Sequence, residues 1–210
     1  MATRQFTGLD AARIAANLER IRDAIGERPR ILAAVKYVGA DELGVLREAG
    51  VTLVGENRAQ ELAVKAEQHP ELDWHFIGQL QSRKVKQILP HVSLVHSVAS
   101  ESALRRLALH GARETEILLE VNVAEEPGKA GIAPAELPRY LELAAVRVVG
   151  LMTMPPFTPN PEHSRRHFAR LAELAAEHGL RELSMGTSQD YAVAAAEGAT
   201  IVRIGTTLYT

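Results

Sequence analysis

The chain has 210 residues, 46% hydrophobic and 24% charged, which is the balance of an ordinary globular protein with room for one domain or two small ones. A formal net charge of −2 gives no global field to attract nucleic acid or an anionic membrane, and the absence of cysteine excludes disulfides, thiolate metal sites and cysteine nucleophiles. Residues 1–6 lack the apolar core of a signal peptide and no run is long enough to span a membrane, so we expect a cytoplasmic protein.

The first segments in chain order are a helix and a strand. Residues 9–25 carry apolar side chains at helical spacing, among them Ile14 and Leu18, and predict a helix. Residues 30–37 form a short apolar run and predict a strand buried on both faces. The alternation then continues, with strands predicted at 52–57, 73–78, 93–98, 116–123, 147–154, 182–185 and 200–208, and helices at 41–50, 58–68, 82–89, 101–110, 135–145, 161–178 and 189–197.

Strands that alternate with helices indicate parallel pairing through right-handed crossovers. Eight such units fit either a closed (β/α)₈ TIM barrel or an open doubly wound sheet. We favour the closed α/β barrel, with an extra N-terminal helix, because closure leaves no edge strand exposed. No linker-like shift in composition divides the chain, so residues 1–210 are predicted to form one domain, and the long loops at 127–131 and 155–161 are candidate lids over a site.

Lys36 is the first candidate site residue, because it ends the first predicted strand. In α/β folds the loops beyond the carboxyl ends of the strands form the crevice where chemistry takes place. A lysine carried into such a crevice can supply a nucleophilic amine for a Schiff base. Taken alone, the same position also fits a lysine that simply reaches solvent.

Two later segments suggest an anion site at the same end of the barrel. Residues 184–188 (Ser-Met-Gly-Thr-Ser) lie at the carboxyl end of the predicted seventh strand, and Gly205 and Thr206 lie toward the carboxyl end of the eighth. In barrels these two loops often bind phosphate with backbone N–H groups and hydroxyls, although a turn with a helix cap would use the same residues. Arg203 lies within a buried strand, where a charged side chain must be paired or functional.

The remaining polar candidates are less specific. Asn57 and His75 could line a pocket or could merely satisfy neighbouring backbone groups. His163 and His167 have the i, i+4 spacing of a helical metal pair, but the neighbouring arginines would repel a cation, so we expect no metal site. Neither a G-x-G-x-x-G nor a P-loop motif occurs, which removes support for a Rossmann dinucleotide site or a P-loop.

Six motifs spread over nearly the whole chain resemble one family. They are A-A-V-K-Y around Lys36, V-G-E-N-R-A-Q-E at 54–61, W-H-F-I-G-Q-L-Q-S-R-K at 74–84, G-L-M-T-M from Gly150, L-S-M-G-T-S-Q-D from Leu183 and V-R-I-G-T from Val202. The chain is similar to the pyridoxal phosphate homeostasis proteins (the YggS-like, PROSC-like family), whose fold is the barrel domain of bacterial alanine racemase.

This resemblance implies a specific site for pyridoxal 5′-phosphate (PLP). Lys36 would form the Schiff base, and Arg203 would approach the pyridine nitrogen, where a permanent cation disfavours ring protonation. The family pattern also implies a phosphate group held by Ser184, Gly205 and Thr206, and a ring pocket lined by Asn57, His75 and Met152.

Three functions are compatible with these residues. The resemblance implies a monomeric PLP-binding protein, with no catalytic residue assigned, that buffers the cofactor or delivers it to apo forms of PLP-dependent enzymes. A PLP-dependent amino-acid racemase is the alternative, with Tyr37 or His75 as the second acid/base group that racemisation requires. A lysine Schiff-base aldolase without cofactor would also use the barrel and Lys36.

Overall fold

The computed structural model describes residues 5–210, which form a closed parallel barrel of eight strands in the order β1 to β8. The predicted (β/α)₈ barrel is therefore confirmed, while the N-terminal segment expected to lack a signal peptide lies largely outside the described residues. The strands are β1 Arg30–Ala34, β2 Leu53–Glu56, β3 Asp73–Phe76, β4 Leu94–Val98, β5 Glu116–Glu120, β6 Arg147–Met152, β7 Glu182–Thr187 and β8 Ile201–Ile204.

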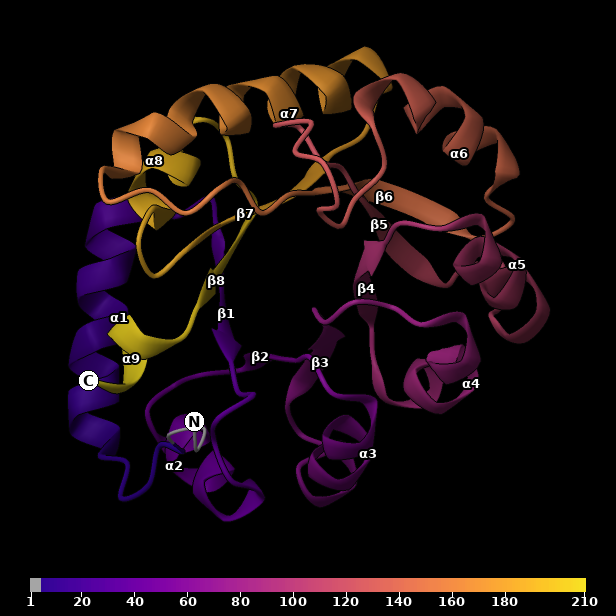
Figure 1. Cartoon of the computed structure of the whole chain (residues 1–210). Helices are drawn as coiled ribbons and strands as arrows, with labels where there is room; N and C mark the ends of the chain where they lie inside the picture. Colours follow the sequence, from indigo (N-terminus) through magenta and orange to yellow (C-terminus); the bar gives the residue numbers. More distant parts are fainter. Residues whose placement is uncertain (1–4) are drawn as a thin grey trace.

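Helices surround the barrel on its outer side (Figure 1). Short 3₁₀ turns precede or follow several of them, at Ala40–Glu42, Ser82–Lys84, Leu89–His91, Pro134–Glu136 and Pro161–Ser164. The α-helices are α1 Ala11–Ile25, α2 Leu43–Glu48, α3 Ala59–Gln68, α4 Val85–Ile88, α5 Glu101–His110, α6 Leu137–Leu143, α7 Arg165–Glu177, α8 Tyr191–Ala196 and α9 Thr206–Tyr209. In the described part of the chain, no helix is long and apolar enough to cross a membrane.

Helix α1 precedes the first strand, as predicted, and the capping residues explain where it begins and ends. The Asp10 side chain accepts a hydrogen bond from the backbone N–H of Arg13 at 2.9 Å, and Gly26 ends the helix with a φ of 73°. The stripe that includes Ile14 and Leu18 is buried against the barrel. At the other end of the chain, α9 lies beside α1 (Figure 1).

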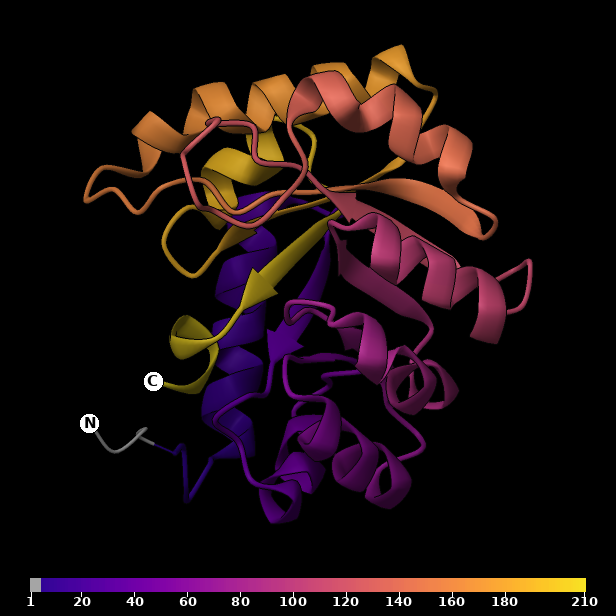
Figure 2. The ribbon, with the colours of Figure 1, turned by 45° about the vertical axis from the view of Figure 1, so that its right-hand side comes forward.

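The barrel closes through pairing of β1 with β8, which lie side by side (Figure 2). Side chains alternate across each strand, so every second residue points into the barrel. One set of inward residues forms an apolar layer: Leu32, Leu53, Leu94, Leu118, Met152 and Ile201. Two residues further along three of these strands, the inward positions are His96, Glu120 and Arg203, all buried, so polar groups replace the apolar layer toward the carboxyl ends.

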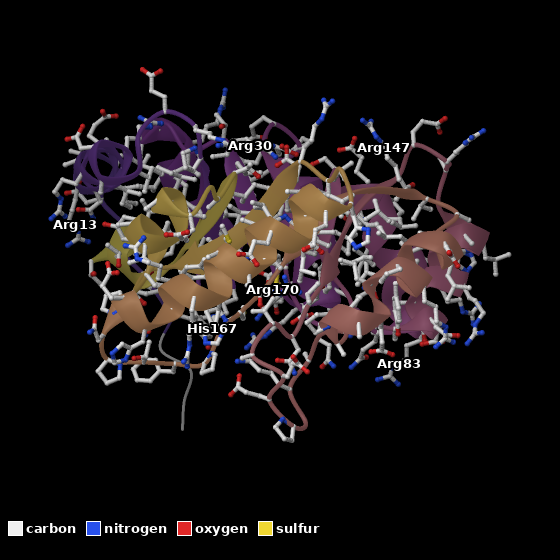
Figure 3. The ribbon with its side chains drawn as sticks, turned by 90° about the horizontal axis from the view of Figure 1, so that it is seen from above. Arg13, Arg30, Arg83, Arg147, His167 and Arg170 are labelled. Carbon is white, nitrogen blue, oxygen red and sulfur yellow. The ribbon has the colours of Figure 1, made fainter. Side chains whose placement is uncertain are left out.

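The two ends of the barrel lie on opposite edges of the molecule. Figure 3 shows Arg30 and Arg147, the first residues of β1 and β6, on one edge and Arg83 and His167 on the other. The loop between β5 and α6 projects beyond the second edge (Figure 3). The carboxyl ends of all eight parallel strands therefore open on the side of Arg83 and His167, called the rim below.

Candidate functional site

Lys36 lies at the rim, but two residues beyond the strand that the sequence predicted would contain it. Strand β1 ends at Ala34, and the backbone turns so that the Val38 N–H donates to the Val35 carbonyl at 3.0 Å. The Lys36 side chain is half-buried, and its Nζ lies 4.6 Å from the centroid of the Tyr37 ring. This amine forms no ion pair with any described residue.

Two buried side chains hold the turn that carries Lys36. The Tyr209 hydroxyl donates to the Ala34 carbonyl at 3.2 Å, and the Lys65 ammonium donates to the Val35 carbonyl at 2.9 Å. Burial raises the pKa of Tyr209, so the phenol stays protonated and remains a donor. The backbone immediately before Lys36 is thus fixed from two sides, by α9 and by α3.

Lys65 also forms a buried ion pair with Glu56, in which Lys65 Nζ lies 2.6 Å from Glu56 Oε2. Both side chains are almost fully buried, with 3% and 0% of their surface exposed, so each charge needs the compensation that its partner supplies. The other Glu56 oxygen accepts the backbone N–H groups of Asn57 at 2.7 Å and Arg58 at 3.0 Å. Sequence reasoning missed this pair, although Lys65 shares its helix face with Leu62 and Ala66, where a charge signals a buried partner.

Asn57 follows β2 and has an unsatisfied atom. Its Oδ1 is buried and has no hydrogen-bond partner among the described residues. Ala34 pairs with Gly55 across β1 and β2, so Lys36 and Asn57 lie at equivalent positions, two residues past that pair. Because buried polar atoms are normally hydrogen-bonded, this unpaired oxygen is an exception among the described residues.

The loops after β7 and β8 meet at Ser188. The Ser188 Oγ accepts the backbone N–H groups of Gly205 at 3.1 Å and Thr207 at 3.4 Å. The Thr207 hydroxyl donates back to the Ser188 carbonyl at 3.3 Å. Convergent backbone N–H groups are the kind of donor that binds phosphate, and the predicted phosphate contacts of Gly205 and Thr206 stay a prediction.

Ser184 is not part of this loop contact. Strand β7 continues to Thr187 rather than ending at Met185, so Ser184 lies inside the strand and its side chain is fully buried in the barrel. The Ser184 Oγ accepts a hydrogen bond from Arg203 and contacts His96 Nδ1 at 2.8 Å. The hydroxyl that faces the two loop N–H groups is therefore that of Ser188, whereas a contact between Ser184 and a phosphate stays a prediction.

His75 is also deeper than the sequence suggested. It lies within β3 with 1% of its surface exposed, and its Nδ1 is 2.8 Å from His96 Nε2. Met152 belongs to the apolar layer inside the barrel. Both residues lie inside the barrel, and His96, which sequence reasoning missed, joins His75 to Ser184.

Arg203 is the only arginine among the buried residues of the described chain, with 6% of its surface exposed. It donates to Ser184 and, at 2.9 Å, to the Thr153 carbonyl, which uses two of its five N–H donors. Burial lowers its pKa to about 10, partly opposed by the negative charges of Glu120 and Asp190, so it remains cationic at neutral pH. Burial conversely raises the pKa of Glu120.

His163 and His167, the two histidines at helical spacing, have separate partners in the structure. Residues 5–210 contain no group of three or more His, Cys, Asp or Glu side chains that could hold a metal ion. His163 lies in a 3₁₀ turn with its Nδ1 3.2 Å from the Thr158 hydroxyl, and Arg166 donates to His167 at 3.3 Å.

Comparison with known proteins places this geometry in a family. The model of the protein family described as "Alanine racemase, N-terminal domain" matches residues 9–210. The pyridoxal phosphate homeostasis protein of Aquifex aeolicus is 41% identical, with 94% of this chain and 96% of the relative covered, and that of Escherichia coli is 32% identical, with 93% and 95% covered. The chain belongs to the pyridoxal phosphate homeostasis protein family.

Solved structures agree with this membership. PipY of Synechococcus elongatus, solved without PLP and with PLP bound, is 34% identical; the structure without PLP gives a TM-score of 0.82 and that with PLP 0.81, and both cover 94% of this chain and 100% of PipY. Alanine racemase of Corynebacterium glutamicum has a TM-score of 0.78 at 15% identity, over 96% of this chain and 62% of the racemase. The racemase likeness concerns the fold alone.

Proposed function

We propose that this protein binds PLP at the rim of the barrel and takes part in PLP homeostasis, by buffering or delivery, as one domain over residues 1–210. The observation that carries the proposal is the combination of a rim lysine with two backbone N–H groups that converge on the Ser188 Oγ. PLP has an aldehyde and a phosphate, and these are the groups that an amine and an N–H cradle recognise. PipY, a relative with the same fold, was solved with PLP bound.

The residues of the chain would divide the work of binding. Lys36 would condense with the aldehyde, its Nζ bonding to the aldehyde carbon while one water leaves, and PLP would supply that electrophilic carbon. Ser188, Gly205 and Thr206 would hold the phosphate. The unpaired Asn57 Oδ1 would serve as a hydrogen-bond acceptor for PLP, and Arg203 would supply N–H donors from inside the barrel.

The covalent tether is tested by absorbance. Purified protein loaded with PLP should show the yellow absorbance band of a lysine-bound cofactor, and Lys36→Ala should lose it. Lys86, which is exposed on α4, provides the matched control, since Lys86→Ala should keep the band. A wild-type protein that stays colourless with added PLP would refute the proposed function.

A carrier and a racemase differ in what happens at the Cα of an amino acid. Racemisation requires acid/base groups on both faces of that carbon. For a carrier we expect no sustained Cα exchange when loaded protein is incubated with L-amino acids in deuterium oxide. Exchange with turnover would instead assign a PLP-dependent racemase.

The same proposal extends to partners and location. The protein would act as a monomer in the cytoplasm and would pass PLP to apo forms of PLP-dependent enzymes. Transfer to an apoenzyme should then be faster from the loaded protein than from an equal concentration of free PLP. Equal rates would indicate buffering without delivery.

A further inference from the structure

A line of buried polar side chains crosses the inside of the barrel, from β8 to β3. Arg203 donates to Ser184, whose Oγ lies 2.8 Å from His96 Nδ1, and His96 Nε2 lies 2.8 Å from His75 Nδ1. The His75 Nε2 lies 3.6 Å from an Asp73 oxygen. All members except Asp73 are buried, with at most 6% of their surface exposed: Arg203, Ser184, His96 and His75.

Chemistry gives this line a single direction. A guanidinium can only donate, so Ser184 accepts from Arg203 and has its own proton to donate. The contact available to that proton is His96 Nδ1, so His96 carries its hydrogen on Nε2 and donates it to His75 Nδ1. His75 then has its hydrogen on Nε2, directed toward Asp73.

We propose that His96 and His75 are positioning residues for Arg203, acting through Ser184, and that both are Nε2–H tautomers fixed by this one-way line of donors. The inference rests on the proposed function, because the guanidinium so oriented is the group that would meet the PLP ring. The line connects the buried Arg203 guanidinium, at the end where PLP would bind, to the Asp73 carboxylate at the opposite end of the barrel.

The charges around the line favour this arrangement. His96 must remain neutral to accept from Ser184, and burial, together with the nearby charge of Arg203, holds the pKa of His96 well below its usual value. The contact with His75 lowers the pKa of Asp73, which keeps the carboxylate ionised at the far end. Asp73 is 46% exposed and lies in a surface hollow with Arg30 and Thr52.

Removing the acceptor at His96 Nδ1 should release Ser184. Its hydroxyl would then be free to turn away, and Arg203 would lose a fixed acceptor while keeping the Thr153 carbonyl. The guanidinium would sample other orientations, so its donors would meet a ring acceptor less often. Because a ring nitrogen affects the electronic spectrum of PLP, the spectrum reports this change directly.

The tautomers can be measured without cofactor. In ¹⁵N-labelled apoprotein at pH 7, long-range ¹H–¹⁵N spectra should show neutral Nε2–H imidazoles for both His75 and His96, each assigned by the loss of its signals in a variant. An Nδ1–H tautomer or a protonated ring at His96 would overturn the proposal. This measurement uses wild-type protein and does not depend on whether PLP binds.

Two substitutions separate the halves of the line. In His96→Asn the side-chain amide lies near the former position of Nδ1, so its oxygen can still accept the Ser184 hydroxyl. In His96→Gln the amide lies near the former position of Nε2, so the acceptor for Ser184 is lost. His96→Gln should weaken PLP binding about fivefold to tenfold and change the pH profile of the bound-PLP spectrum, as Ser184→Ala should, while His96→Asn should retain most of the wild-type profile. The exposed His110→Gln is the control.

The outcomes are distinguishable. If folded His96→Gln and Ser184→Ala both bind PLP with the wild-type affinity and spectrum, the positioning role is refuted while the proposed function stands. If wild-type protein does not bind PLP, the proposed function fails, whereas the tautomer measurement still tests the line itself.

Discussion

Lys65 and Lys36 meet the same turn of the chain but lie in different surroundings. Lys65 is buried, paired with Glu56 at 2.6 Å and bonded to the Val35 carbonyl. Lys36 is half-buried, and its Nζ lies over the Tyr37 ring without a carboxylate at ion-pair distance among the described residues. Lys65 is buried and bonded to the turn, so it supports the turn, whereas Lys36 has no such partner among the described residues and remains available for chemistry.

The same contrast separates the barrel interior from the rim. Inside, Arg203, Ser184 and His96 each have partners, whereas at the rim the Asn57 oxygen has none among the described residues. Substitutions in the interior should therefore reduce stability, with an effect on PLP only through Arg203, whereas substitutions at the rim should act on ligand binding directly. Four measurements break or sharpen this distinction.

The largest effect is expected at the buried ion pair. Lys65→Met leaves the Glu56 carboxylate buried without its partner, which should lower the free energy of unfolding by about 3–5 kcal/mol. Urea titration of the variant and of the control Lys86→Met measures the difference. If Lys65→Met were as stable as wild type, Glu56 would have to reach water, contrary to its full burial.

A smaller stability effect should follow pH. The unfolded chain protonates His96 near pH 6.5, whereas the pKa of the folded His96 lies well below that value. Below pH 6.5 the unfolded state therefore binds the additional proton, and the free energy of unfolding falls by up to roughly 1.4 kcal/mol per pH unit.

Thermal unfolding of wild type and His96→Asn between pH 7 and pH 5 tests this contribution. The variant should lose less stability on acidification than the wild type does. Parallel pH dependence in the two proteins would show that His96 is not the group that takes up the proton.

At the rim, Ser188→Ala should weaken PLP binding, and it also removes the acceptor of the Gly205 and Thr207 N–H groups. Loss of the hydroxyl removes one contact to the phosphate, and PLP affinity should fall about tenfold, or ~1.4 kcal/mol. Pyridoxal, which lacks the phosphate, should bind the variant and the wild type equally. A weakened affinity for both compounds would place Ser188 near the ring instead.

The smallest effect is expected where interior and rim meet. Tyr209→Phe removes the donor to the Ala34 carbonyl and should reduce the free energy of unfolding by about 1 kcal/mol. PLP affinity should fall only slightly, because Lys65 still holds the adjacent Val35 carbonyl. A loss of affinity as large as that of Ser188→Ala would show that Tyr209 controls the position of Lys36.

The sequence by itself determined the barrel and most of the rim. Short apolar strands that alternate with amphipathic helices specify the order of elements locally, and the number of units favoured closure. Lys36, Asn57, Gly205 and Thr206 could be predicted as rim residues because each follows a strand. That these residues lie on one face follows from the rule that parallel strands of a barrel all end on the same side.

Only the tertiary structure decided which polar groups are saturated. Ser184 and Ser188 stand in one hydroxyl-rich segment, and the extension of β7 to Thr187 buries the first and leaves the second at the rim. Likewise, His96 meets Ser184 across the barrel, between strands 88 residues apart in sequence. Local pattern specifies which residues form a strand, whereas hydrogen bonding between distant strands depends on their three-dimensional register.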